Sequence, residues 1–511
     1  MIFQSILFDS FEIGLFKEEA KAPSCFLDLK LDMIVDAITS GRDEYNLKPI
    51  FHVPLTQVGS IHYRQSILQD LENQAAFRSI KSFGNQMRTM RDHLHQGEKL
   101  SYKRQKQRYF ADAVNIYCDL ILDLAKDLAV VELKSTGLLA FQEFLGDYVD
   151  SPDFQLLNSD INRVKSGLSE VRYCLEIEGS RIEVSRNETD SDYSAEVLHS
   201  FEKFKQGAVQ EHEFAFSTGP GMNHVEAAVL DLVAKLYPEV FSALDQFCDH
   251  HQDFLDVTIR TFDREVQFYM ACLEHVERFR AAGLGFCYPE VSDQAETIQA
   301  CGTFDLALAN KLVQEHASLV CNDFKLTNPE RILVVTGPNQ GGKTTFARMI
   351  GQIHFLACLG CPVPGESASL LLFDRLFTHF EKEENLDNGT SKLEDDLIRI
   401  HEILELATSK SILIMNESLS ATTLSDALFL GKQLLGLITE RGLRCVIVTF
   451  LEELASLSAA TVSMVSTVDP DDLAHRTFKV VRKPADGLAY AAALAEQHHL
   501  TYDCVRGRLT T

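Results

Sequence analysis

Residues 337–344 form the segment with the clearest chemical meaning in this chain. Their sequence, GPNQGGKT, matches the phosphate-binding pattern GxxxxGK[ST]; it follows an apolar run at 332–335 and precedes a segment of helical character at 345–359. Glycines allow the backbone to form a concave nest of N–H groups that faces phosphate oxygens, and the following helix presents its positive end to the same anion. The residues predicted to bind a nucleotide are consecutive: Gly337, Pro338, Asn339, Gln340, Gly341, Gly342, Lys343, Thr344 and Thr345.

Two side chains of this segment have distinct predicted roles. Lys343 is expected to reach the β- and γ-phosphates. Thr344 supplies the small hydroxyl that Mg²⁺ accepts as a ligand alongside phosphates and water. The segment therefore predicts ATP and Mg²⁺ as ligands, and a glycine loop that matches the pattern by chance is the alternative.

A second apolar run, residues 411–415, ends in Asn416 and Glu417. A nucleotide-hydrolysing protein is expected to end such a strand in carboxylates, and Glu417 is able to polarise an attacking water. Asn416, the second predicted metal-site residue beside Thr344, is neutral and cannot give Mg²⁺ the charged support that a carboxylate gives. We therefore predict weak metal binding and slow turnover, with a core strand followed by an ordinary turn as the alternative.

A polar, glycine-containing turn at 388–394 lies between these two segments and leads into a helical stretch. Ser391 and the N–H groups at the start of that helix are able to contact the γ-phosphate of a nucleotide held by a second subunit. ATP would then form part of a dimer interface. A serine that simply caps the helix explains the same residues equally well.

The elements expected to position these residues differ between the two halves of the chain. From about residue 331, short aliphatic runs alternate with helical segments, which predicts an α/β sheet with crossover helices. Residues 61–146 are poor in Gly and Pro and carry apolar residues at helical spacing, so long helices are expected there. A second helical block, 225–282, contains Pro238, which is predicted to break or kink it. Residues 173–184 alternate around a glycine as in a β-hairpin.

Length and charge limit the classes of protein to consider. A chain of 511 residues is expected to form several domains. It contains no run of about 18 uncharged apolar residues, so we expect a protein of the cytoplasm, or of the nucleus in a eukaryote, without a membrane span. A net charge of −26 opposes broad coating of nucleic acid, whereas residues 78–108 carry a local charge of +7. We interpret that basic segment either as a solvated helix surface or as a contact for phosphates or a partner.

Four segments of the second half resemble the MutS mismatch-repair family and occur in that family's order. TGPNQGGKTT is similar to its TGPNxGGKST, and LACLGCPVPG to its LAQxGxxVPA. FTHFEKEENLDNGTSKLEDDL is similar to FTRxGAxDDLxxGxSTFxxEM, and SILIMNESLSATTLSDAL to SLVLxDExGRGTSTxDGL. The resemblance extends from about residue 322 to 509, and IHYRQSILQDLEN at 61–73 resembles the start of the family's helical lever region.

The resemblance implies a domain organisation. It implies an ABC-type P-loop ATPase domain at 291–511, preceded by a mainly α-helical core and lever domain at 61–290. A reduced clamp would lie near 173–214, and residues 1–60 stay unassigned. We expect these N-terminal residues to be too few for a mismatch-reading domain with a full connector.

The resemblance also implies roles for individual residues. Lys343 and Thr344 would bind ATP with Mg²⁺, and Glu417 would be the catalytic carboxylate. Ser391 would be the signature serine that acts across a dimer, and Asp426 would belong to the dimer-facing loop.

The chain departs from the family pattern around the predicted phosphate site. Asn416 stands where the metal-supporting Asp is expected, and Phe450 stands where the family has the His that helps sense the γ-phosphate. Lys392 and Leu393 replace Thr-Phe in the signature, and residues 420–423 lack the glycine of GRGTST. These departures affect hydrolysis more than nucleotide binding.

Two functions from different classes follow from these observations. The first is an ATP-dependent, DNA-binding protein of this family with weak ATPase activity, which closes as a homodimer or as a heterodimer with a related ATPase. It would act in DNA repair or recombination, on branched DNA rather than by reading mismatches. The second is a slow or non-hydrolysing ATP-binding scaffold whose nucleotide state controls partner or DNA binding. A small-molecule kinase would need an acceptor site and an arginine-bearing lid, which the sequence does not show.

Overall fold

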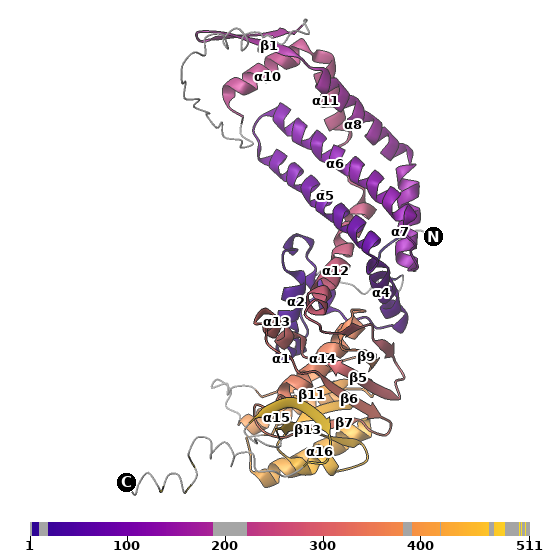
Figure 1. Cartoon of the computed structure of the whole chain (residues 1–511), viewed down its shortest axis with the longest axis vertical. Helices are drawn as coiled ribbons and strands as arrows, with labels where there is room; N and C mark the ends of the chain where they lie inside the picture. The colour runs from indigo at the N-terminus through magenta and orange to yellow at the C-terminus, as the bar shows by residue number, and fades with distance from the viewer. Residues whose placement is uncertain are drawn as a thin grey trace. The chain divides into compact units, whose positions relative to one another are not determined.

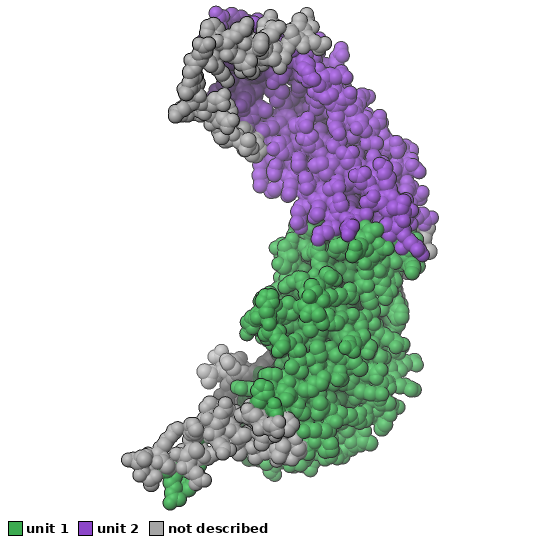
Figure 2. Space-filling view, viewed as in Figure 1, with its two compact units in different colours: residues 1–77, 133–140, 264–511 green, residues 78–132, 141–263 purple. Residues whose placement is uncertain are grey.

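The computed structural model describes residues 3–9, 19–187, 222–381, 391–419, 421–469 and 475–485, together with 500, 502 and 506. The chain divides into two compact units, which Figure 2 shows in different colours. Unit 1 comprises residues 1–77, 133–140 and 264–511, and unit 2 comprises residues 78–132 and 141–263. Among the residues described, no helix combines the length and the apolar composition needed to cross a membrane.

Unit 1 contains a six-stranded sheet, of which β7, β11 and β13 are labelled in Figure 1. Its strands are β7 (Ile332–Thr336), β10 (Leu376–Phe380), β11 (Ile412–Asn416), β12 (Arg444–Val448), β13 (Thr461–Val468) and β14 (Arg476–Arg482). Their order across the sheet is β10-β11-β12-β7-β13-β14. The first five strands are mutually parallel, and β14 runs antiparallel to β13.

Helices cover both faces of this sheet, which explains why its central strands are continuous apolar runs. On one face, α15 (Lys392–Leu406) and α16 (Leu424–Arg441) form a core with Leu413 and Met415 of β11. On the other face, α14 (Lys343–Cys358) packs so closely on Ile414 that a Cβ at Gly351 would lie 2.6 Å from Ile414 Cδ1. A mixed architecture of strands and crossover helices, as the alternation of segments predicts, is therefore present in this half.

One of the apolar runs that follow residue 331 is divided between two strands. The apolar run at 369–377 contributes β9 (Ser367–Leu371) to a second sheet and β10 to the main sheet. Asp374 lies between the two strands and accepts hydrogen bonds from Ser411 Oγ and Thr408 Oγ1, both at 2.7 Å. These hydrogen bonds fix Asp374 at the break between the two strands. The apolar sequence around Asp374 does not by itself indicate this break.

The second sheet of unit 1 has four strands in the order β4-β9-β5-β6. These are β4 (Glu290–Ser292), β9, β5 (Thr297–Thr303) and β6 (Asn322–Thr327), and α13 (Leu306–Gln314) connects the last two. A short antiparallel pair is formed by β3 (Phe286–Cys287), which precedes β4 in the chain, and β8 (Val363–Pro364), which precedes β9. The N-terminal helices of the unit are α1 (Cys25–Leu29), α2 (Leu31–Thr39), α3 (Lys48–His52) and α4 (Val58–Leu71), and α12 (Val257–Arg280) contributes its residues from 264 onward.

Unit 2 is mainly helical. Its helices are α5 (Gln74–Lys99), α6 (Lys103–Val130), α7 (Thr136–Val149), α8 (Pro152–Glu170), α10 (His224–Leu236) and α11 (Pro238–His250), the first residues of α5 and α7 belonging to unit 1. Pro238 is the first residue of α11, so it separates two helices as predicted. The predicted hairpin is β1 (Tyr173–Glu178) paired with β2 (Arg181–Arg186), and Gly179 adopts φ +60° in its turn. The remainder of the predicted clamp, 188–214, lies outside the described residues.

Several cations of the basic segment form ion pairs within unit 2. Lys103 and Arg104 both bind Asp245, and Arg91 binds the buried Asp263. These charges are partly neutralised by acidic residues that are more than 100 positions away in the sequence. The local charge of +7 therefore overstates the positive potential of this surface. These ion pairs favour the interpretation of the segment as a solvated helix surface over that of a contact for phosphates or a partner.

Candidate functional site

The predicted phosphate-binding segment forms a tight loop between β7 and α14. Gly337 and Gly342 have φ values of +117° and +91°, in the region that favours glycine. Any side chain would also clash, because a Cβ at Gly337 would lie 2.7 Å from the Ser466 carbonyl oxygen and one at Gly341 would lie 2.3 Å from Ser466 Oγ. Ser466 Oγ donates a hydrogen bond to the Gly341 carbonyl. The glycines thus let the loop pack against β13. The N–H groups of the loop then lie next to the start of α14.

Lys343, the first residue of α14, is folded back onto this loop. Its Nζ donates hydrogen bonds to the carbonyl oxygens of Gly337 (3.0 Å) and Pro338 (2.9 Å) and contacts Asn339 Oδ1 at 3.4 Å. The side chain is only 4% exposed. Burial lowers the pKa of the Lys343 ammonium, and the nearby Glu417 carboxylate opposes that shift.

Phe450 covers the Lys343 ammonium. The centre of its ring lies 4.9 Å from Lys343 Nζ, within the range of a cation–π contact. The ring itself is 53% exposed. An aromatic ring at this position attracts the lysine but has no N–H group to donate to a phosphate.

Thr344 and Asn416 are 72 positions apart in the sequence and form a direct hydrogen bond. Thr344 Oγ1 donates to Asn416 Oδ1 over 2.8 Å, because β11 ends beside the start of α14. A hydroxyl that donates its proton in this way keeps its oxygen lone pairs for a cation, so the pair fits an oxygen-ligand metal such as Mg²⁺. The neutral amide leaves such a site with less negative charge than a carboxylate would give.

Glu417 follows β11 in a left-handed conformation, with φ +54°. Its N–H donates a 3.0 Å hydrogen bond to the Val448 carbonyl of β12, which holds the turn against the sheet. The side chain lines a cavity of about 480 Å³ that also contains Lys343 and Thr344. The structure thus brings the carboxylate and the phosphate-binding segment to the same cavity.

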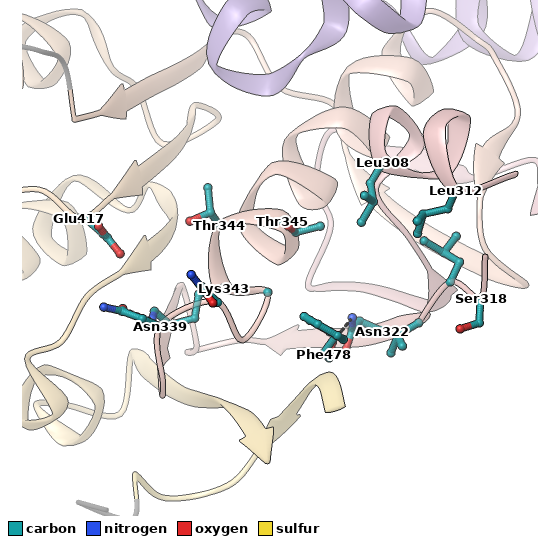
Figure 3. A pocket seen from close by; sticks show the side chains of 14 residues that line it. Leu308, Leu312, Ser318, Asn322, Asn339, Lys343, Thr344, Thr345, Glu417 and Phe478 are labelled. Carbon is teal, nitrogen blue, oxygen red and sulfur yellow. Dashed lines mark hydrogen bonds between the residues drawn. The ribbon is translucent and has the colours of Figure 1, made fainter. Parts of the chain in front are cut away.

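The cavity has a polar side and an apolar side (Figure 3). The polar side carries Asn339, Gln340, Gly342, Lys343, Thr344, Thr345 and Glu417. The apolar side is formed by Leu308 and Leu312 of α13, by Leu319 and Val320, and by Phe478 of β14. Phosphate oxygens would suit the first side and a flat aromatic base the second, and the volume lies in the range of small-molecule sites.

Asn322 and Arg476 complete the surroundings of the cavity. Asn322 is buried and fixes β14, since its Oδ1 accepts from Val480 N at 2.7 Å and its Nδ2 donates to the Phe478 carbonyl at 3.3 Å. Arg476 Nε donates to the Asn339 carbonyl at 3.2 Å, which places a second cation beside the loop. Neither residue belongs to the GxxxxGK[ST] motif, and nor does the apolar side, because these residues come from elements 15 to 30 positions before the loop and more than 130 after it.

Ser391 and Asp426 lie away from this cavity in the described structure. Ser391 is the N-cap of α15 and accepts a hydrogen bond from Glu394 N at 3.3 Å, which is the capping role considered as the alternative. Asp426 lies in the first turn of α16, where its carboxylate accepts from Thr423 Oγ1 at 2.8 Å. Residues 388–390 of the predicted signature lie outside the described residues. A role for Ser391 or Asp426 at a nucleotide would require a second subunit.

Comparison with known families agrees with this geometry. Residues 333–497 match the family model described as MutS domain V. This region of the chain is therefore similar to a domain of the MutS family. It begins within β7 and includes α14, β11 and the cavity residues Lys343 and Glu417.

Curated relatives are DNA mismatch repair proteins named MutS. The protein of Chlorobium phaeobacteroides is 28% identical over 282 residues, which cover 55% of this chain and 30% of the relative. The protein of Orientia tsutsugamushi is 30% identical over 217 residues, 41% of this chain and 24% of the relative, and that of Brevibacillus brevis is 30% identical over 187 residues, 36% and 21%. The chain therefore spans less than a third of the length of these relatives.

Proposed function

We propose that this chain binds ATP with Mg²⁺ and hydrolyses it slowly, as an ABC-type P-loop ATPase of the MutS type. The observation that carries the proposal is the convergence of Lys343, Thr344 and Glu417 on one cavity that also has an apolar side. The match of residues 333–497 to MutS domain V supports the same conclusion. The similarity to proteins named for DNA mismatch repair supports a role on DNA.

In this proposal each residue of the site has a separate task. Lys343 leaves the Gly337 and Pro338 carbonyls and stabilises negative charge on the transferred phosphoryl group. Glu417 orients and polarises the attacking water, and Asn416 holds the Thr344 hydroxyl in place. A bound Mg²⁺ would shield the phosphate charges.

The proposal includes a dimer, because the surface near the site carries exposed apolar side chains. In α16, Leu424 is 72% exposed and Phe429 is 63% exposed, and α15 exposes Leu397 and Ile398. Exposed apolar side chains that lie in one patch are typical of association surfaces, and we propose that these four form such a patch. A second copy that covers α15 and α16 would also bring its Ser391 towards a neighbouring nucleotide, which supports ATP-dependent closure around DNA.

Steady-state and single-turnover hydrolysis of ATP test the proposal directly. We expect slow turnover that is abolished in Lys343→Ala and Glu417→Gln, with Glu417→Gln still able to bind ATP. Light scattering with and without ATP and Mg²⁺ should show dimers that depend on nucleotide. Hydrolysis that persists in Glu417→Gln would remove the catalytic role of that carboxylate.

Asn416 and Phe450 favour a second candidate function, an ATP-gated scaffold that does not turn over. Both residues replace groups that would assist hydrolysis, and neither disturbs the loop that binds phosphate. Tight ATP binding without turnover in the unaltered protein would establish this second function. ATP would then act by favouring one conformation of the protein.

A further inference from the structure

The turn that carries Glu417 is held in an unfavourable backbone conformation. Both Glu417 and Leu419 have positive φ values, +54° and +64°. Residues other than glycine adopt this region only where their surroundings stabilise it. Two anchors are evident: the Glu417 N–H bonds to the Val448 carbonyl, and the Leu419 side chain is buried in the core beneath α15 and α16.

A third anchor acts on Ser418, between these two residues. His379, in the neighbouring strand β10, lies with its Nδ1 2.8 Å from Ser418 Oγ. In the tautomer that carries a proton on Nδ1, the imidazole donates to Ser418 Oγ, and the serine hydroxyl in turn donates to the His379 carbonyl over 3.4 Å. The His379 side chain is fully buried, which fixes its orientation.

The opposite edge of the same imidazole ring reaches α15. His379 Nε2 lies 3.4 Å from Asp396 Oδ1, and Arg399 lies 4.0 Å from the same oxygen. Burial raises the pKa of the Asp396 carboxyl. The 3.4 Å separation of Nε2 and Asp396 Oδ1 is a close electrostatic approach and not a hydrogen bond. One ring therefore links the turn after β11 to the helix that Ser391 caps.

We propose that His379 is a positioning residue, which holds Ser418 and thereby keeps the Glu417 carboxylate in its place at the nucleotide cavity. His379 does not line that cavity and acts through the turn. The inference rests on the proposed function in that Glu417 acts on ATP. Its structural part, that the imidazole holds the turn, is independent of turnover.

A matched pair of substitutions separates the two sides of the ring. The amide nitrogen of Asn occupies the position of the histidine Nδ1, so His379→Asn keeps a donor for Ser418 and loses the Asp396 contact. The amide nitrogen of Gln corresponds to Nε2, so His379→Gln keeps the Asp396 contact and loses the donor to Ser418. Ser418→Ala removes the acceptor and leaves the imidazole intact.

The variants are compared by two measurements on the full chain. One is the kcat and KM for ATP. The other is amide hydrogen exchange, read by mass spectrometry, of the peptide that covers residues 412–423. Peptides from β5 and β6, in the second sheet of the same unit, report whether each variant is folded.

We expect His379→Gln and Ser418→Ala to lower kcat roughly 10- to 100-fold with KM changed less than about twofold, the loss typical of a misplaced catalytic group. Exchange at 412–423 should rise roughly fivefold, as for the loss of one hydrogen bond. His379→Asn should stay close to the unaltered protein in both measurements.

Two results would overturn the inference. One is unchanged exchange at 412–423 in His379→Gln and Ser418→Ala. The other is the reverse order, in which His379→Gln is tolerated and His379→Asn is not, since the Asp396 contact would then carry the effect. If the unaltered protein shows no turnover, the hydrolytic proposal fails separately, and the exchange data still decide whether His379 holds the turn.

Discussion

Replacing Asn416 with Asp is the sharpest test of how this site treats its metal. The Thr344 hydroxyl donates to Asn416 Oδ1 over 2.8 Å, and an aspartate keeps that acceptor oxygen. The substitution therefore changes the charge of the site and leaves its hydrogen bond and shape nearly unaltered.

The size of the effect follows from the geometry. A Mg²⁺ ion bound to Thr344 Oγ1 at about 2.1 Å would lie at most about 4.9 Å from residue 416 Oδ1, the sum of the two distances. Attraction between a divalent cation and a carboxylate at this separation is about 7 kcal/mol at an effective dielectric constant near 20 and about 1.7 kcal/mol in water. Asn416 is only half-buried, which places the site towards the lower figure. We expect a gain of about 1.4–2.7 kcal/mol, a 10- to 100-fold increase in Mg²⁺ affinity.

The assay is a Mg²⁺ titration of ATP binding and of ATP hydrolysis in Asn416→Asp and in the unaltered protein. Gln433→Glu, on the exposed side of α16, adds the same charge to the same unit and serves as the matched control. An apparent Mg²⁺ dissociation constant of Asn416→Asp within about twofold of that of the unaltered protein would refute the reasoning. If Thr344 binds the ion, a negative charge this close must change the Mg²⁺ affinity. An equal gain in Gln433→Glu would show that only the overall charge matters.

Three further predictions concern Phe450, His354 and the basic segment. Phe450→His should raise the single-turnover rate of ATP hydrolysis at least about tenfold by adding an N–H donor beside Lys343, whereas Phe450→Ala, which only removes the ring, should not. Burial lowers the pKa of His354 from 6.5 to about 4, so between these pH values the unfolded chain binds more protons than the folded chain and the free energy of unfolding falls as the pH falls. From pH 7 to pH 5 the expected loss is about 1.8 kcal/mol. Urea unfolding of His354→Asn should lack this part of the pH dependence. Lys99→Glu with Lys106→Glu, two exposed positions of the basic segment, should weaken binding to duplex DNA and reduce the slope of log affinity against log salt by about 2, while an unchanged slope would remove this surface from any DNA contact.

The parts of the site that are contiguous in the chain were predictable from the sequence. The loop between β7 and α14 depends on glycines at fixed offsets and on an apolar strand before it, and both are local properties. Pro238 interrupts the second helical block and Gly179 turns the hairpin for the same reason: each acts on its own backbone dihedral angles. The family pattern also identified Asn416 and Phe450 as unusual residues before their positions were known.

The contacts that give those residues their roles were decided by the tertiary structure. Strand order brings Asn416 to Thr344 across 72 positions and places Phe450 over Lys343 across more than 100. Packing of α11 on α6 likewise brings Asp245 to Lys103 and Arg104, which neutralises charges that appear clustered in the sequence. The apolar side of the cavity and the contact of His379 with Ser418 involve ordinary residue types without a motif. Local patterns specify the backbone of short segments, but packing between distant segments decides which side chains meet. In this chain those contacts determine the charge around the cavity and the position of the Glu417 carboxylate.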